Sequence, residues 1–159
     1  MFFWFLGVSV VAVWLVFQSP ALDYRVVMLG SVLPLVELVA GRPLFLHTLA
    51  GAVVALGLVM AVTVRRRLLR RRWLGIPIGL FVHLVLDGVW TDTALFWWPF
   101  AGPLPDEALP EISRGVWSLA LEVVGLAAGV WWVRRFQLTD RDRLRTFLRD
   151  GRLGRDLVS

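Results

Sequence analysis

A histidine and an aspartate stand four residues apart, His83 and Asp87, near the end of an otherwise apolar stretch. Four residues is about one helical turn, so on a helix the imidazole and the carboxylate share one face. Three more ionisable residues interrupt apolar stretches elsewhere: Glu37, His47 and Glu122. Two imidazoles with one or two carboxylates suit zinc or another divalent ion, with a coordination position left open for water. A metal site is therefore the first hypothesis for these residues.

The composition is that of a membrane protein. Of the 159 residues, 58% are hydrophobic, and the mean hydropathy is +0.71. Soluble domains have an apolar content of about 45–50%. The chain has no cysteine, which excludes disulfides and thiolate metal sites. Its pI near 11.3 comes from arginines placed as a membrane topology requires, and no nucleic-acid motif accompanies them, so we expect no nucleic-acid partner.

Five apolar runs predict an all-α, polytopic protein with about five transmembrane helices. A crossing needs about 20 mostly apolar residues, and only the second run is marginal in length. The runs cover residues 2–17, 26–40, 44–64, 73–90 and 116–133. They predict a helical bundle over residues 1–135, followed by a basic tail over residues 136–159.

The arginines predict the orientation. Fifteen of the seventeen fall on one side of this topology, and only Arg42 and Arg114 fall on the other. The positive-inside rule then places the N-terminus outside and the C-terminus in the cytoplasm. We expect a multi-pass protein of the inner (cytoplasmic) membrane. Trp90, Trp97 and Trp98 are expected to anchor the outer membrane interface.

The tail reads TDRDRLRTFLRDG over residues 139–151 and predicts an amphipathic helix. Thr139 is the expected N-cap, and Leu144, Phe147 and Leu148 share one helical face. The arginines of this helix and of residues 65–72 are expected to bind anionic headgroups of the inner leaflet. A partner-binding or disordered tail is the alternative.

The predicted topology brings all five ionisable residues into the outer half of the membrane. A charge at the centre of a membrane helix costs about 2.5–3.5 kcal/mol, so such groups usually face the bundle interior and pair with one another. They could hold a metal ion, form a structural polar network that fixes helix packing, or line the ion path of a small transporter. The residues alone leave all three open.

Four segments resemble one family of small polytopic proteins. They are DYRVVMLGSVLP (23–34), LHTLAG (46–51), PIGLFVHLVLDGVW (77–90) and FWWPFAG (96–102). The family is the membrane-bound metal-dependent hydrolases, grouped with the LexA-binding, inner-membrane-associated type. In it, a His-Ser or His-Thr pair opens one helix and a His-x-x-x-Asp closes another. The resemblance, over about half of the chain, implies metal ligands at His47, His83 and Asp87, with Thr48 beside the first.

The chain departs from that family at one position. The family carries acidic residues after the GSVLP stretch, in a form like LPDLID, whereas this chain has Leu35, which cannot bind metal. Glu37 lies about 200° further around a helix and can replace the missing acid only if Pro34 distorts the helix or if the helix register differs. Either Glu37 is the fourth ligand or the site lacks one. Thr48 and Glu122 are expected to orient the ligand side chains without contacting the metal themselves.

The functional hypothesis is a metal-dependent hydrolase, with zinc as its cofactor, acting at the outer leaflet on an ester or phosphoester of a lipid or envelope component. The metal would lower the pKa of a bound water from 15.7 to about 7. No catalytic residue is assigned; Asp92 could act as a base, but an external aspartate is more commonly just solvated. The alternatives are a non-catalytic membrane protein with a structural polar network and a small transporter or ion path.

The orientation can be tested by cysteine labelling, because the chain has no cysteine of its own. A Glu107→Cys variant should react with a membrane-impermeant thiol reagent in intact cells. An Arg70→Cys variant should react only after the membrane is permeabilised. The reverse pattern would place the ionisable residues in the inner half of the membrane.

Overall fold

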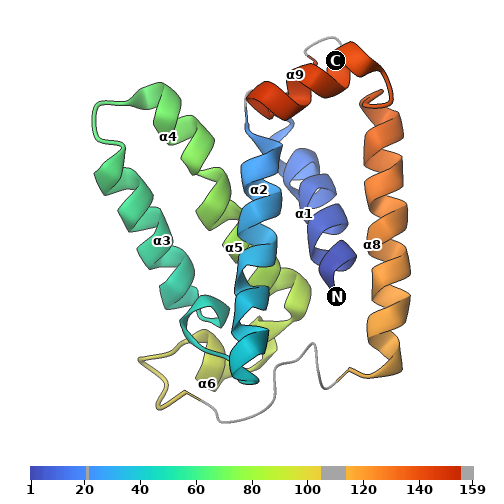
Figure 1. Ribbon diagram of the computed structural model, residues 1–159. Helices are drawn as coiled ribbons and strands as arrows, with labels where there is room; N and C mark the ends of the chain where they lie inside the picture. Colours follow the sequence, from blue (N-terminus) through green and yellow to red (C-terminus); the bar gives the residue numbers. More distant parts are fainter. Residues whose placement is uncertain (21, 105–113, 155–159) are drawn as a thin grey trace.

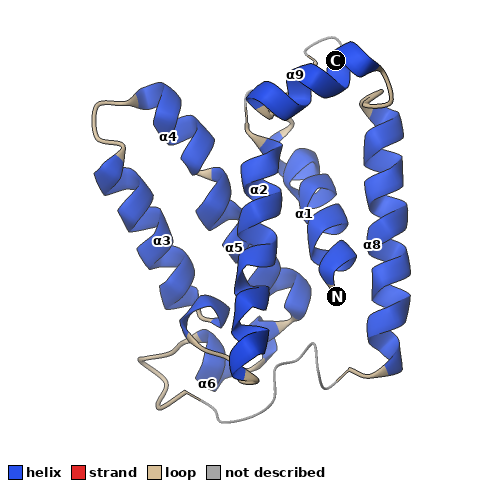
Figure 2. Ribbon diagram, in the orientation of Figure 1, coloured by secondary structure: helices blue, strands red, loops and turns tan. Residues whose placement is uncertain are grey.

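The computed structural model describes residues 1–20, 22–104 and 114–154, which are helical and contain no strand (Figure 2). The predicted all-α class is thus confirmed for them; Glu107, the outer labelling position, lies outside these ranges. The helices are α1 Phe2–Phe17, α2 Tyr24–Val32, η1 Leu33–Ala40, η2 Phe45–His47, α3 Leu49–Val62, α4 Arg67–Trp73, α5 Gly75–Asp87, η3 Val89–Thr91, α6 Thr93–Phe96, α8 Val116–Arg135 and α9 Arg141–Asp150.

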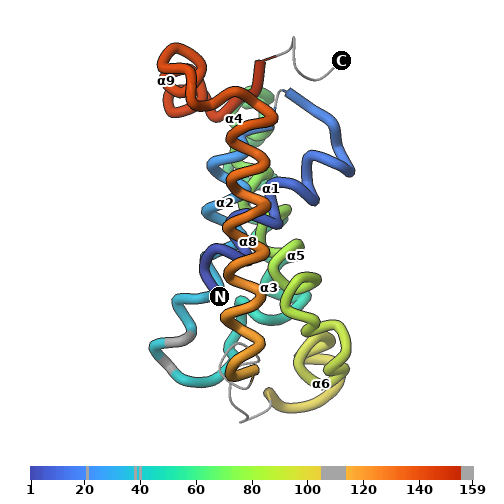
Figure 3. Tube along the Cα trace, turned by 90° about the vertical axis from the view of Figure 1, so that its right-hand side faces the viewer, coloured from blue at the N-terminus to red at the C-terminus, as the bar shows by residue number. Residues whose placement is uncertain are grey.

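The helices form an elongated bundle with different elements at its two ends (Figures 1 and 3). Helix α2 packs against α5 and α1, α8 packs on the other side of α1, and α3 packs on α5. Helices α4 and α9 lie at one end, whereas α6 lies at the other. The short helix η2, which holds His47, and the C-terminal end of α5, which holds His83 and Asp87, lie toward the α6 end.

Glycines allow the central helices to approach closely. A Cβ atom on Gly79 of α5 would lie 2.3 Å from the Val27 carbonyl oxygen of α2. One on Gly30 of α2 would lie 2.4 Å from the carbonyl oxygen of Ile76. Small residues at such contacts let helix backbones meet, which is the usual packing device inside membranes. The α2–α5 pair is therefore held by backbone proximity rather than by large side chains.

The outer surface of the bundle is apolar. Helix α8 is the one helix in the described part of the chain with the length and composition to cross a membrane, and only 11% of its 18-residue apolar window is buried. The core helix of a soluble protein would be mostly buried. Helices α1 and α3 are apolar but shorter. The exposed apolar face of α8 fits contact with lipid, whereas the five-crossing topology remains a prediction.

Two of the predicted runs are interrupted. The run over residues 26–40 changes from α-helix to 3₁₀-helix at Leu33, next to Pro34, whose missing N–H and ring oppose a continuous α-helix. The run over residues 44–64 is broken at Thr48, which has an extended backbone and caps α3 by accepting a 3.0 Å hydrogen bond from Gly51 N. Both interruptions lie beside ionisable residues of interest.

The predicted N-cap of the tail helix is wrong by one residue. Asp140, and not Thr139, caps α9: its carboxylate accepts hydrogen bonds from Arg143 N at 3.0 Å and Asp142 N at 2.9 Å. These two N–H groups lower the pKa of the Asp140 carboxyl. At a pH above the ordinary pKa of aspartate, the ionised Asp140 carboxylate therefore stabilises α9. This stabilisation is lost only as the pH falls through the lowered pKa.

The tail helix docks on the bundle. Phe147 and Leu153 are buried with Trp132, whereas Leu144 and Leu148 on the same predicted face are 39% and 60% exposed. The helix therefore uses one apolar residue of that face for the bundle and leaves two at the surface.

A buried aspartate, Asp23, links several elements at the α4–α9 end of the bundle. Asp23 caps α2 and pairs with Arg25 at 2.8 Å and with Arg72 of α4 at 3.1 Å. Next to it, Tyr24 N donates to the carbonyl oxygen of Gly151 at 3.0 Å. The contacts join α2, α4 and the segment after α9.

The close packing of α1 on α8 can be tested with two glycines of one helix. A Cβ on Gly125 would lie 2.3 Å from the Phe3 backbone, whereas one on Gly129 would meet nothing within 4 Å. Alanine favours a helix by about 1 kcal/mol over glycine at both positions. Gly125→Ala should nevertheless lower the thermal unfolding midpoint in detergent, because overpacking costs about 1–3 kcal/mol. Gly129→Ala should leave it unchanged or raise it. Equal midpoints would contradict the close α1–α8 contact.

Candidate metal centre

Three of the predicted ligands come together in the structure. His47, His83 and Asp87 are buried, and one ligand atom from each lies within 4.8 Å of the others. His47 ends η2, whereas His83 and Asp87 occupy successive turns of α5. The one-turn spacing thus places both α5 side chains toward the same partner, as the sequence predicts.

Hydrogen bonds determine which nitrogen of each imidazole faces the cluster. His47 Nδ1 donates to a carboxylate oxygen of Glu37 at 2.7 Å, and His83 Nδ1 donates to the carbonyl oxygen of Ser31 at 2.7 Å. Carboxylate and carbonyl oxygens only accept, so both Nδ1 atoms carry the proton in this assignment. The Nε2 atoms, the lone-pair nitrogens of neutral imidazoles, then face each other 3.4 Å apart.

This separation fits two ligands of one metal ion. Zinc–nitrogen bonds of about 2.0–2.1 Å in a tetrahedron place two ligand nitrogens about 3.3 Å apart. The Asp87 carboxylate lies near enough that an approach of at most about 1.5 Å would bring it to the same spacing. A proton shared between the two imidazoles would also satisfy both lone pairs, so the geometry fits a bound cation in general.

Glu37 stands behind His47. The sequence predicts it as a fourth ligand, but its two oxygens accept hydrogen bonds from Leu44 N, Leu46 N and His47 Nδ1, each at 2.7 Å. It lies in η1, the 3₁₀ segment that includes Pro34, so the distortion needed to turn it inward is present. The carboxylate thereby orients His47 rather than joining the three-residue cluster itself.

Thr48 and Glu122 occupy different places. The buried Thr48 hydroxyl donates to the Phe45 carbonyl oxygen at 2.8 Å and caps α3, which supports the turn that carries His47. Glu122 of α8 instead accepts hydrogen bonds from Phe2 N and Phe3 N at 2.6 Å, at the start of α1. Among the described contacts, Glu122 therefore serves the α1–α8 pair and not the cluster.

The remaining polar and aromatic residues of this end have structural positions. Asp92 caps the short helix α6 by accepting hydrogen bonds from Ala94 N and Leu95 N. Its described contacts are therefore structural and do not link it to the cluster. Trp90 and Trp97 are 58% and 50% exposed at the α6 end of the bundle, where interface anchors were expected. Trp98 is half-buried, with its ring centroid 6.3 Å from that of Phe45.

Two neighbours of the cluster were not predicted. Arg114 Nη1 lies 2.6 Å from Asp87 Oδ1, and its Nη2 donates to the Asp87 carbonyl oxygen. The Phe5 ring of α1 stacks on His83 with centroids 3.9 Å apart. Arg114 could have been suspected, because a buried aspartate needs a cation and the sequence has only two arginines on the predicted outer side. Nothing in the sequence points to Phe5.

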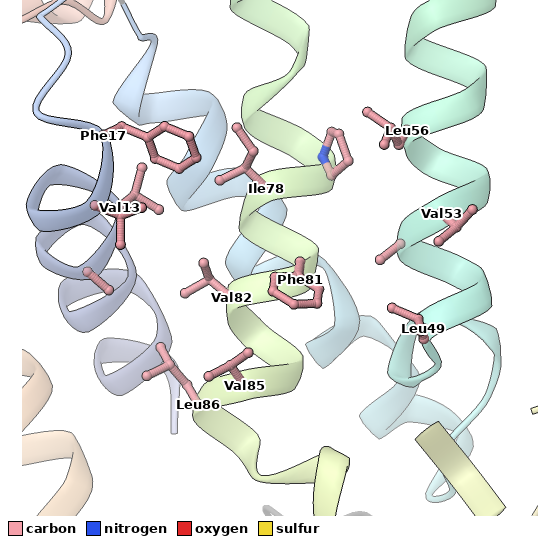
Figure 4. Close-up of a pocket in the computed structure, with 14 residues that line it drawn as sticks. Val13, Phe17, Leu49, Val53, Leu56, Ile78, Phe81, Val82, Val85 and Leu86 are labelled. Carbon is pink, nitrogen blue, oxygen red and sulfur yellow. The ribbon is translucent and has the colours of Figure 1, made fainter. Parts of the chain in front are cut away.

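An apolar groove lies on a different face of α5 (Figure 4). Its volume is about 490 Å³, and its walls come from α1, α3 and α5, with Val13, Leu56 and Phe81 among the lining residues. The lining contains none of the cluster residues. The groove therefore belongs to the apolar surface, whereas His83 and Asp87 lie on the buried face of the same helix.

Comparison with known proteins identifies a family but no individual relative. No curated protein and no solved structure matches the chain. The family model described as YdjM inner membrane protein matches residues 4–144, most of the chain. This match confirms the predicted location in the inner membrane and carries no statement about metal binding or hydrolysis. The chain thus belongs to the YdjM inner membrane protein family.

Proposed function

We propose that this inner membrane protein holds a divalent metal ion, zinc, between His47, His83 and Asp87 and hydrolyses an ester or phosphoester of a lipid or envelope component. The observation that carries the proposal is the pair of imidazole Nε2 atoms, 3.4 Å apart and oriented toward each other. Three protein ligands with a fourth position left open are typical of catalytic rather than structural zinc.

The residues around the cluster have defined tasks in this proposal. Glu37 and the Ser31 carbonyl hold the two imidazoles in the tautomer that can bind metal, as outer hydrogen-bond partners of metal ligands commonly do. Phe5 fixes the plane of the His83 ring by stacking. Arg114 holds Asp87 through Oδ1, which leaves the other carboxylate oxygen, Oδ2, as the ligand atom.

The proposed reaction is hydrolysis. A bound divalent ion supplies Lewis-acid activation of water and of the scissile group. The water oxygen forms a bond to the carbonyl carbon or the phosphorus, the bond to the leaving alcohol breaks, and the alcohol takes the proton that water gives up. The chain contributes the oriented imidazoles, the Asp87 carboxylate and the Phe5 ring that stacks on His83.

The second candidate is a structural polar network without metal. It is favoured by the fact that the same hydrogen bonds also join elements: His83 to Ser31 links α5 to α2, and His47 to Glu37 links η2 to η1. Interhelical hydrogen bonds of this kind average only about 0.6 kcal/mol in membranes. The two functions differ in one measurable property, the metal content.

At the other end of the bundle, we propose that the arginines of α4 and α9 bind anionic headgroups of the inner leaflet. Arg145 and Arg149 of α9 are about 80% exposed, beside the exposed Leu148. Each arginine near such a surface contributes about 1 kcal/mol. This role agrees with the predicted five-crossing topology, in which this end is cytoplasmic.

Element analysis of the detergent-purified protein tests the metal site directly. We expect near-stoichiometric divalent metal, predominantly zinc. His83→Ala and Asp87→Ala should each abolish binding, because each removes a ligand, while the bundle keeps its apolar and glycine contacts. A parent protein that neither contains nor rebinds a divalent metal would leave only the structural network.

Glu37→Gln separates orientation from direct ligation. Its single amide oxygen cannot accept from all three donors that the carboxylate serves, and the charge opposite His47 is lost. We expect metal affinity to fall about 10–100-fold, as for other residues that orient a ligand. Stability of the metal-free protein should change by only about 0.5–1.5 kcal/mol.

Glu122→Gln is the matched control, since it removes a carboxylate that lies outside the cluster. Its metal affinity should equal that of the parent. Equal metal affinities for Glu37→Gln and the parent would show that Glu37 does not orient His47 for metal binding. Complete loss of metal binding would show that Glu37 is a direct ligand.

A further inference from the structure

Arg114 places a positive charge at the edge of the cluster. It precedes α8 in the chain, yet its guanidinium reaches the C-terminal end of α5, where both Nη atoms contact Asp87. The side chain is 27% exposed, so the group is partly buried but still accessible. It is also one of only two arginines on the predicted outer side, and so the positive-inside pattern does not explain it.

The charge balance of the site favours an anionic ligand. Glu37 and Asp87 contribute two negative charges when ionised, and Arg114 contributes one positive charge. A divalent ion at the cluster would change this sum from minus one to plus one. Charges act strongly in a partly buried site, because the effective dielectric constant is lower than that of water. The metal-loaded site would therefore attract a negatively charged group more than a neutral one.

The chemistry of the guanidinium points to phosphate among anions. Its planar fork carries five N–H donors. Nη1 and Nη2 donate to Asp87, and Nη1 also lies 3.9 Å from Met1 Sδ, so among the described contacts Nε and the second hydrogen of Nη2 are the donors left for a phosphate. Such a fork matches the oxygen atoms of phosphate and can bind them bidentately. Arginine beside a metal ion is a common means of stabilising the charge of a phosphoryl group during transfer.

The described carboxylates of this end support the same choice. Glu37 is engaged by loop amides, Asp92 caps α6, and Glu122 holds the start of α1. Thus, among the described residues, the site offers cations rather than an additional proton-transfer group. Phosphoryl transfer depends almost entirely on positioning and electrostatic stabilisation. A site with cations and without an additional proton-transfer residue therefore suits it.

We infer that Arg114 binds the phosphate group of the substrate, which is therefore a phosphoester rather than a carboxylic ester. This inference rests on the metal site proposed above. Arg114 acts as a binding residue that also holds Asp87 in place. The phosphate can belong to a lipid headgroup or to a soluble phosphoester, since both present the same oxygen atoms.

Phosphorus NMR relaxation tests the inference without relying on turnover. The detergent-solubilised full chain is loaded with Mn²⁺, its metal content is measured, and inorganic phosphate is titrated in. Phosphate bound beside the paramagnetic ion should show strongly enhanced ³¹P relaxation. Arg114→Gln should weaken phosphate binding at least tenfold at equal metal content, and Arg114→Lys, which keeps the charge but not the fork, should lie between.

Arg134→Gln is the control for loss of one positive charge, because Arg134 lies in the last turn of α8, at the opposite end of the bundle, and is not among the arginines of α4 and α9. It should bind phosphate as the parent does. Competition by phosphatidate in mixed micelles, compared with glycerol phosphate, then identifies the source of the phosphate: displacement by phosphatidate alone indicates a lipid, and displacement by glycerol phosphate a soluble ester.

Two results would overturn the inference while leaving the metal site intact. One is a metal-loaded parent that does not enhance phosphate relaxation. The other is an Arg114→Gln variant that binds phosphate as tightly as the parent. Failure of the parent to take up Mn²⁺ or zinc would instead overturn the proposed function itself, and the measured metal content distinguishes these cases.

Discussion

The candidate site depends on two imidazole Nε2 atoms held 3.4 Å apart. When both Nδ1 atoms carry the proton, neither Nε2 atom has a hydrogen, and the two lone pairs repel each other unless a cation lies between them. Hydrogen bonds on the opposite side of each ring impose this arrangement, because the Glu37 carboxylate and the Ser31 carbonyl each accept a hydrogen bond from the Nδ1 of one ring. Neither partner belongs to the cluster of His47, His83 and Asp87, yet each decides which imidazole nitrogen is available.

Helix packing places these partners within reach. The glycines of α2 and α5 bring the two backbones together, so His83 can donate directly to a backbone carbonyl of the neighbouring helix. The change to 3₁₀-helix beside Pro34 turns Glu37 toward the amides that precede His47, and the Thr48 cap ends that turn. The polar site is therefore a consequence of local departures from regular α-helix at the ends of α2 and α3.

Burial of these groups in a membrane protein constrains what they can do. Each buried charge is costly, and the contacts of Asp87 with Arg114 and of Glu37 with three donors offset that cost. The family establishes the inner membrane as the setting, whereas the chemistry rests on the geometry of the cluster. A structural network and a metal site share these contacts and differ in the cation that lies between the imidazoles.

The sequence by itself determined the helical class, the membrane setting and the shared face of His83 and Asp87, because apolar run length and the four-residue spacing are local properties. It joined His47 to this pair only through the predicted topology and the family resemblance. It placed the tail helix within one residue, since capping residues also act locally. It did not determine that Glu37 supports His47 rather than binding beside it, that Glu122 serves the start of α1, or that Arg114 pairs with Asp87. Those pairings join residues 10, 120 and 27 positions apart. Only tertiary structure decided them, because a carboxylate accepts from whichever donors the folded backbone brings within hydrogen-bonding distance, and residue spacing alone does not identify those donors.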